Sequence, residues 1–380
     1  MNKIEMCALV CLLEGAVSAA TGASNEFRLD TRTGVRTAAA TEKIQYSTAW
    51  ATNLTASGDT EDATHEIKAV VKVNPCLKTP PKYLVVDMSG GRSAARWPIS
   101  YLDEVPSGGW TDEYKTEKLV LRYIPAGSFI MGGRATDYPG AVNTNLHMVT
   151  LTKPFYIGVF ECTQKQWQLV MGSNPSSYKG DCRPVECVSY SMIRGTGAQA
   201  GAGWPTYGHA VDGTSFMGKL QAKTGLVFDL PTEAQWEYAC RLKADGTCWT
   251  TALNSGKNLT STLSCPNMAE VGRYYYNQSD GKGGFSSAHT KVGSYRPSEL
   301  GLYDMHGNVW EWCLDWYVSS LGSGAVEEPK GPATGSRRLL RGGGWDGGAR
   351  DCRSASRGYD GPLSNDYYGG FRVASLLVVQ

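Results

Sequence analysis

The sequence has little excess charge of either sign, because 37 Lys and Arg residues are balanced by 36 Asp and Glu residues, for a net charge of +1 over 380 residues. A nearly neutral chain has no electrostatic footprint for nucleic acid or an anionic membrane, which argues against a DNA-binding role. No C-x-x-C motif occurs, so a zinc ribbon or a thioredoxin-like centre is not expected. The Gly-rich stretches GGRSAARW and GGGWDGG lack the strand–loop–helix setting of a phosphate loop and are interpreted as turns.

Long apolar runs are also missing. The run Met6–Leu13 is too short to span a membrane, and no other stretch of the chain could span one. This run lies between the basic Lys3 and the small residues 17–19, a pattern typical of a cleaved signal peptide over residues 1–19. We therefore expect an exported protein that is periplasmic, secreted or held at the cell surface. The alternative is an amphipathic N-terminal tail.

The cysteines fit an oxidising compartment. Removal of Cys7 and Cys11 with the signal peptide leaves nine of the 11 cysteines, an odd number that predicts some disulfides and at least one free thiol. The cysteines expected to form bridges are Cys182 and Cys187, and Cys248 and Cys265 on either side of a polar loop, but the sequence does not determine how they pair.

The length predicts two domains, and the pattern changes near Lys118. Residues 25–118 hold short alternating segments, such as 43–52, 65–73, 82–88 and 96–102, which predict a small all-β domain that serves as a spacer or as a binding module. Residues 119–380 form the second domain. It begins with a strand, a turn at 125–127 and a second strand, and it contains a long irregular stretch over 242–300.

Two helices in the second domain have capping signals. In TQKQWQLVMG, Thr163 can cap the helix N-terminus, and Gln166, three residues later, can complete a capping box with it. Gly172 is expected to end the helix. In LPTEAQWEYACR, Thr232 and Gln235 repeat this arrangement.

Six blocks follow one another along this domain: YIPAGSFIMGG, FECTQKQWQLVMG, RPVECVSY, LPTEAQWEYACR, GLYDMHGNVWEWCLDWY, and RLLRGGGW with CRSASR and GFRV. In this order they resemble the formylglycine-generating-enzyme (sulfatase-modifying factor) family over about residues 119–376. The resemblance implies an α+β fold, a C-type-lectin-like variant with much irregular structure, preceded here by the small all-β domain.

The family's oxidase uses two cysteines after the G-S-W turn to bind copper and handle the substrate thiol. Aligning RSASR with the family's R-C-A-A-R places Ala349 at the second cysteine, and Cys352 is out of register. Oxidase activity and copper are therefore not expected. The iron-dependent sulfoxide synthases of the family use three histidines, but the five histidines here show no clustered spacing.

A calcium site is better preserved. In GLYDMHGNVWEW, the family's ligands map onto the side chain of Asp304, the carbonyls of Gly307 and Val309, and the carboxylate of Glu311. All four are hard oxygen ligands, and the backbone ligands need the sharp turn that Gly307 allows. The alternative is a Gly-Asn turn that leads into a strand.

The C-terminal segment 344–370 has the composition of a binding surface, in which Tyr supplies contact area and Gly, Ser, Asn and Asp supply adaptable polar contacts. The predicted ligand-binding residues are Asp346, Gly347, Arg350, Asp351, Arg357, Tyr359, Asp360, Ser364, Asn365, Asp366, Tyr367 and Tyr368. Trp345, Cys352, Ala355 and Phe371 are expected to be buried and to hold the segment to the scaffold.

The same residue types arise when only the adenines of the Asn codons AAT and AAC are changed. The segment is therefore similar to the variable region of a diversity-generating retroelement, in which a reverse transcriptase mutates template adenines. Target proteins of these elements commonly have the lectin-type fold with the variable region at the C-terminus. The alternative is a family loop that is rich in turn residues.

These patterns favour an exported, non-catalytic binding protein whose C-terminal surface contacts a protein or glycan ligand on another surface. One alternative is an oxidase-like enzyme of the formylglycine family that acts on a sulfatase cysteine. The other is a structural cell-surface module.

Overall fold

The computed structural model describes residues 25–30, 66–71, 80–195, 211–278 and 287–376. The chain divides into two compact units, Met1–Pro80 with Val378–Gln380, and Pro81–Leu377. In the first unit, β1 (Asn25–Asp30) pairs antiparallel with β2 (Glu66–Val71), which confirms the strand predicted over 65–73. The predicted signal peptide, the segment 43–52 and Cys76 lie outside the described residues.

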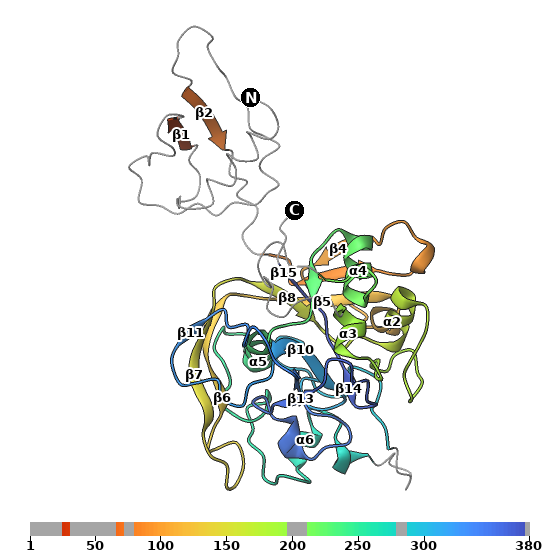
Figure 1. Ribbon diagram of the computed structural model, residues 1–380, viewed down its shortest axis with the longest axis vertical. Coiled ribbons are helices and arrows are strands. Elements are labelled where there is room, and N and C mark those ends of the chain that lie inside the picture. The colour runs from red at the N-terminus through yellow and green to blue at the C-terminus, as the bar shows by residue number, and fades with distance from the viewer. Residues whose placement is uncertain (1–24, 31–65, 72–79, 196–210, 279–286, 377–380) are drawn as a thin grey trace. The chain divides into compact units, whose positions relative to one another are not determined.

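A six-stranded sheet organises the second unit, in the order β4–β3–β5–β8–β15–β9 (Figure 1). Its strands are β3 (Tyr83–Asp87), β4 (Ile99–Leu102), β5 (Lys118–Ile124), β8 (Phe155–Gly158), β9 (Phe228–Asp229) and β15 (Ala374–Leu376). Each neighbouring pair is antiparallel. The last strand, β15, lies between β8 and β9, so the chain's final segment completes the interior of the sheet.

The sheet corrects the predicted boundary at residue 118. Strands β3 and β4 come from the segment assigned to the N-terminal domain, yet β3 pairs with β5 along its whole length, with Val85 opposite Val120. All four residues Tyr83–Val86 of β3 are buried. Because this apolar strand needs the neighbouring β5 to cover it, the second unit begins at Pro81.

Two smaller sheets complete the second unit. The three-stranded sheet has the order β11–β7–β6, and the four-stranded sheet the order β13–β12–β10–β14. Their strands are β6 (Gly127–Gly133), β7 (Thr144–Leu151), β11 (Val326–Glu327), β10 (Trp310–Trp316), β12 (Arg338–Arg341), β13 (Gly358–Asp360) and β14 (Gly369–Gly370). The helices are short: α2 (Gln164–Met171), α3 (Tyr190–Arg194), α4 (Phe216–Thr224), α5 (Glu233–Arg241) and α6 (Pro266–Ala269). This mixture confirms the α+β class, and the stretch predicted to be irregular contains only α6 and a 3-10 turn, Tyr275–Asn277, among its described residues.

Both predicted helix caps are confirmed. Thr163 and Gln166 form a reciprocal capping box on α2, and Gly172 ends that helix with a φ of 92°. Thr232 and Gln235 form the same box on α5. Every residue of α5 is buried, so this helix lies inside the unit. Its side chains can therefore contact the C-terminal segment from the interior of the unit.

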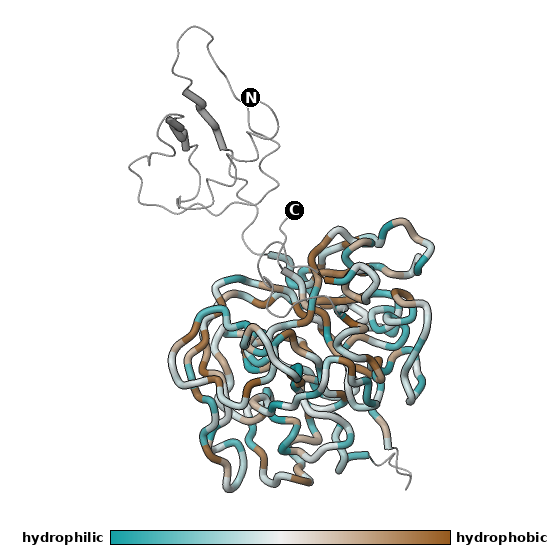
Figure 2. Tube along the Cα trace, in the orientation of Figure 1, coloured by the Kyte–Doolittle hydropathy of each residue, from teal (hydrophilic) through white to brown (hydrophobic). Residues whose placement is uncertain are grey.

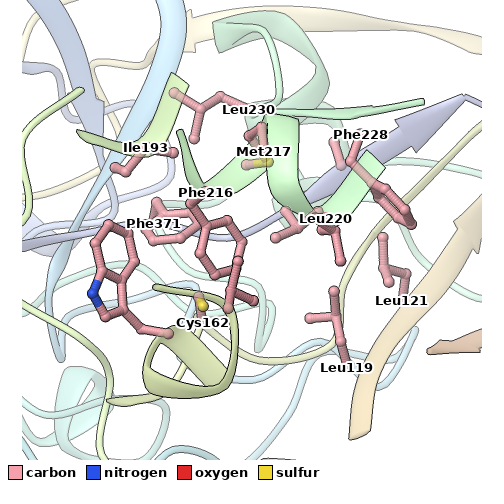
Figure 3. Close-up of a cluster of buried hydrophobic side chains, with 14 of the residues drawn as sticks. Leu119, Leu121, Cys162, Ile193, Phe216, Met217, Leu220, Phe228, Leu230 and Phe371 are labelled. Atoms are coloured by element: carbon pink, nitrogen blue, oxygen red, sulfur yellow. The ribbon is translucent and has the colours of Figure 1, made fainter. Parts of the chain in front are cut away.

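The largest apolar cluster lies where α2 and α4 pack near the central sheet. Figure 2 shows apolar segments running through the strands that meet there, and Figure 3 shows Phe371 facing Phe216 at its centre. The ring centroids of Phe371 and Phe216 are 5.1 Å apart, and Trp167 stacks on Phe216 at 5.3 Å. Phe371 directly follows the C-terminal segment, so this cluster holds one end of it.

The predicted disulfides are not present. All eight cysteines among the described residues are free thiols, including Cys182, Cys187, Cys248 and Cys265. Cys265 is buried in the cluster around Leu253, whereas Cys248 packs against the cluster of α5, so the second pair is divided between two cores. Across the described ranges, no helix is long and apolar enough to cross a membrane.

Replacing Phe371 by Ala should lower the free energy of unfolding by about 3–5 kcal/mol, because it leaves a cavity between Trp167 and Phe216. The matched control is Leu363→Ala, since Leu363 is 71% exposed in the same segment and its loss should change stability by about 0.5 kcal/mol or less. Urea unfolding followed by tryptophan fluorescence measures both. Similar losses for the two variants would show that Phe371 does not anchor the segment.

Candidate ligand-binding site

The C-terminal segment 344–370 is held by buried side chains at intervals. Trp345, Cys352 and Phe371 are buried as predicted. Ala355 is only half-buried, which corrects its assignment as a fourth buried residue, because it faces a cleft next to β6 and β7. Between the buried positions the chain passes through a 3-10 turn (Ala349–Cys352), β13 and β14.

The predicted ligand-binding residues divide by exposure. Asp346, Arg350, Tyr359, Asn365, Asp366 and Tyr367 are exposed, whereas Gly347, Asp351, Arg357, Asp360, Ser364 and Tyr368 are half-buried. The exposed members can contact a ligand without any rearrangement. The half-buried members have partners within the protein, which determine the shape of the surface.

One group of half-buried residues forms a hydrogen-bonded loop. Asp360 Oδ1 accepts from Ser364 Oγ and from the Gly361 amide, both at 2.7 Å. The hydroxyl of Tyr368 lies 3.1 Å from the carboxylates of both Asp360 and Asp366. Burial tends to raise the pKa of Asp360, but the hydrogen bonds from Ser364 and Gly361 lower it overall. The ionised Asp360 therefore organises the loop over 360–368.

Arg357, one of the predicted ligand-binding residues, is held by partners within the protein. Its Nε and Nη2 donate to the two carboxylate oxygens of Glu233 at 2.6 and 2.9 Å, and its Nη1 donates to Val318 O at 2.7 Å. Its side chain is 11% exposed. Arg350, by contrast, is 58% exposed, and its ion pair with Asp351 is long, at 3.9 Å.

The exposed tyrosines rest on aromatic neighbours. Tyr359 packs on Tyr317 with ring centroids 4.1 Å apart. Tyr367 lies 5.6 Å from Trp345, which in turn contacts Tyr178 at 5.3 Å. These contacts hold the rings in place, so little side-chain entropy remains to be lost on binding.

A neighbouring loop, which was not among the predicted site residues, extends this surface. The amide of Tyr275 donates to Gly347 O at 3.0 Å, and Tyr275, Tyr276 and Leu263 are exposed. In the sequence, the run of three tyrosines in a polar loop is the feature that could have indicated this part of the surface. These residues add apolar contact area that does not belong to the C-terminal segment.

The turn predicted to bind calcium has the expected shape. Gly307 has a φ of 85°, and a Cβ there would lie 2.0 Å from Arg273 O, so the turn requires glycine. Asp304 is buried, and its Oδ2 accepts from the Gly293 amide at 2.7 Å, whereas its Oδ1 has no hydrogen-bond partner. Burial raises the pKa of Asp304 to about 6. A buried carboxylate oxygen without a partner fits a hard cation such as calcium.

Glu311 is engaged differently. Its Oε2 accepts from Arg372 Nε at 2.6 Å and from Trp236 Nε1 at 2.7 Å, and Arg372 also contacts its Oε1. Arg372 thus supplies the positive charge next to this carboxylate. Of the two predicted carboxylate ligands, only Asp304 has an oxygen without a hydrogen-bond partner, since both oxygens of Glu311 contact Arg372.

Glu161 is a further buried carboxylate at this turn that the sequence analysis did not assign. Its two oxygens accept from the Val309 amide at 3.0 Å and from Asn308 Nδ2 at 2.5 Å. Burial and the nearby Asp304 raise its pKa well above the ordinary value. In the sequence, Glu161 is marked only as a single carboxylate after the apolar run PFYIGVF. Its two hydrogen bonds hold the turn in place.

An α+β unit of lectin-like type that carries an exposed polar segment before its last strand has known counterparts. The family described as Sulfatase-modifying factor enzyme 1-like domain matches residues 111–377. The chain belongs to this family. The solved structure of variable protein 1 of Treponema denticola is similar at 27% identity and a TM-score of 0.50, covering 68% of this chain and 95% of that one.

Characterised relatives are similar over different shares of their length. The formylglycine-generating enzyme of Streptomyces coelicolor is 28% identical over 284 residues, which cover 66% of this chain and 88% of that enzyme. The serine/threonine-protein kinase pkn1 of Chlamydia pneumoniae is 34% identical over 169 residues, 44% of this chain. The chain spans only 24% of that kinase, so the similarity concerns one part of it.

The structural role of Arg357 can be measured. Arg357→Ala should lower the free energy of unfolding by about 3 kcal/mol, because it leaves Glu233 buried without its bidentate partner. Arg350→Ala, which removes the same charge from an exposed position, should change it by about 0.5 kcal/mol or less. Urea denaturation of the two variants provides the comparison. Equal stability of both would mean that the pair with Glu233 contributes nothing.

Calcium should raise the melting temperature if Asp304 binds it, since an ion at a hundredfold excess over its dissociation constant contributes about 2.7 kcal/mol. Asp304→Ala should remove this shift, whereas Asp245→Ala, at an exposed carboxylate, should keep it. Glu311→Ala is unsuitable because it would strand the buried Arg372. Differential scanning calorimetry with calcium and with a chelator is the measurement. Identical wild-type melts in both conditions would reject the site.

Proposed function

We propose that the protein is an exported, non-catalytic binding protein that displays a diversified surface, formed by residues 344–370, on a lectin-type scaffold. The observation that carries the proposal is the separation of roles within that segment. Its buried residues, among them Trp345 and Cys352, hold it, while its exposed residues apart from Leu363 are Asp, Asn, Arg and Tyr. A surface built in this way can change its contacts without changing its core.

The residue types support diversification through template adenines, because those at the exposed positions belong mainly to the set reached from Asn codons. The similarity to a protein named variable protein 1 supports the same proposal, since it extends over 68% of this chain. The aromatic contacts of Tyr359 and Tyr367 favour a ligand with a broad surface, such as a protein or glycan on another cell.

The oxidase alternative needs a reactive thiol, and the nearest candidate is poorly placed for one. Cys352 is fully buried, its Sγ lies 3.9 Å from Gly344 O, and burial raises its pKa well above the ordinary value. A thiolate, which is the nucleophile and the copper ligand, is therefore disfavoured there. Copper-dependent turnover of a cysteine-containing sulfatase peptide would overturn the non-catalytic assignment.

The proposal predicts that the exposed positions tolerate simultaneous change. A variant with Asp346, Arg350, Tyr359, Asn365 and Tyr367 all replaced by Ser should fold, with each change within about 0.5 kcal/mol. It keeps Asp360, Ser364, Tyr368 and Arg357, which hold the loop. Thermal melts and circular dichroism measure the outcome. A matched variant in which Asp360, Ser364 and Tyr368 are replaced should be clearly less stable.

Unfolding of the five-site variant would show that these residues are part of the structure rather than a display surface. The genomic test is independent of stability. The proposal expects an adenine-rich near-copy of the codons for residues 344–370 beside a reverse-transcriptase gene. If the genome has neither the near-copy nor the reverse-transcriptase gene beside this gene, the diversification part of the proposal is rejected, and the segment is a binding surface of fixed sequence.

A further inference from the structure

A cleft of about 240 Å³ lies beside the C-terminal segment, and its lining includes Tyr317, the residue on which Tyr359 packs. One wall is the segment 350–357, and the others are β6, β7 and the loop over 317–321. The lining residues that matter here are Asn145, Glu237, Arg350, Asp351, Arg353 and Arg357. Its volume suits one amino-acid residue or one sugar ring.

The local backbone keeps this cleft open. Asn145 has a φ of 54°, which is uncommon for a residue other than glycine, and its Oδ1 accepts from the Leu321 amide at 3.0 Å. This bond holds the 317–321 loop against β7. On the opposite strand, Gly132 has a φ of 111°, and a Cβ there would lie 2.5 Å from Asn145 O. The strands therefore meet at this point without a side chain from Gly132.

Two of the three guanidinium groups that line the cleft are held in place before any ligand arrives. Arg353 Nη1 donates to the buried Asp137 at 3.0 Å, and its Nε donates to Arg350 O at 2.8 Å. Arg357 is held by Glu233, as described above. An arginine that is already fixed loses little conformational entropy when it binds a ligand. Arg350 is the exposed member of the three, and its ion pair with Asp351 is long, at 3.9 Å.

The residues around the cleft carry a small positive charge. The charged residues that line the cleft, together with those paired directly with them, comprise the arginines 241, 341, 350, 353 and 357 and the carboxylates Asp137, Glu233, Glu237 and Asp351. Five positive charges against four negative ones leave a net charge of +1 on these residues. Glu237 lies beneath the cleft and is paired with both Arg241 and Arg341, so the extra positive charge belongs to this buried group. Each rim arginine has a carboxylate partner of its own, and Arg350, whose pair with Asp351 is the longest of the three, is the rim arginine most available to an anion.

From this arrangement we infer that the cleft is a second binding site, which takes a carboxylate group borne on a residue-sized ligand, with Arg350 as its principal contact. Arginine suits this role because its planar fork matches the two oxygens of a carboxylate. An acidic amino-acid residue and a uronic sugar share this chemistry. The inference deepens the proposed function, since Arg350 belongs to the displayed segment, but the cleft does not depend on diversification.

The test is a two-dimensional NMR titration of the full-length protein with N-acetyl-L-glutamate and, separately, with glucuronate. Saturable shifts with the first ligand alone identify a peptide source for the carboxylate, and with the second alone a saccharide source, and either outcome supports the site. Arg350→Gln should weaken the binding by about tenfold. Ala355→Leu, which fills the cleft without changing its charge, should abolish it while the melting temperature shows that the variant is folded.

The matched control is Arg96→Gln, which removes an equal charge from an exposed residue of the β3–β4 connection and should leave the affinity unchanged. The inference is overturned if neither ligand binds, if Arg96→Gln weakens binding as much as Arg350→Gln, or if sodium sulfate binds equally well, since the last result would make this an unselective anion site. The five-site stability test and the genomic test do not use these ligands. Failure of the cleft is therefore distinguishable from failure of the display surface.

Discussion

Two buried arginines hold the ends of the C-terminal segment, and most of what is distinctive in this structure depends on them. Arg341, at the end of β12, pairs with Glu237 of α5 and donates to the carbonyls of Ser354 and Ser356. Arg372, just before β15, pairs with Glu311 and donates to Gly158 O at 2.9 Å and Tyr303 O at 3.0 Å. A buried guanidinium that lost its carboxylate would be strongly destabilising, so both ends stay fixed while the chain between them can differ.

These pairs explain which features the sequence could predict. The capping boxes of α2 and α5 depend on residues three apart, and both were predicted correctly from their spacing. Arg341 and Glu237 are separated by 104 residues, and Arg372 and Glu311 by 61, and no local pattern relates such partners. The pairing of Arg357 with Glu233 could not be predicted for the same reason, because Glu233 lies 124 residues away. Glu161 escaped notice because its partners, Asn308 and Val309, are equally distant in the chain.

The fold itself was predicted through resemblance rather than periodicity. Ordered blocks such as GLYDMHGNVWEW indicated the family, but the family match does not include β3. The alternating pattern of residues 82–88 predicts a strand without indicating which sheet that strand joins. The boundary therefore moved to Pro81 once the pairing of β3 with β5 was visible. Of the twelve predicted ligand-binding residues, six are exposed and six are half-buried, because polar turn residues indicate a surface segment but not which of its side chains the protein itself engages.

The place of β15 inside the central sheet has a consequence for synthesis of the chain. A ribosome releases residues in order, and the gap between β8 and β9 cannot be filled until Ala374–Leu376 has emerged. Every residue of the displayed segment is translated before that strand. A single-base insertion or deletion in the codons for the segment would therefore shift the frame of β15 and leave the sheet open. Any change in the codons for this segment therefore has to keep the reading frame if β15 is to form.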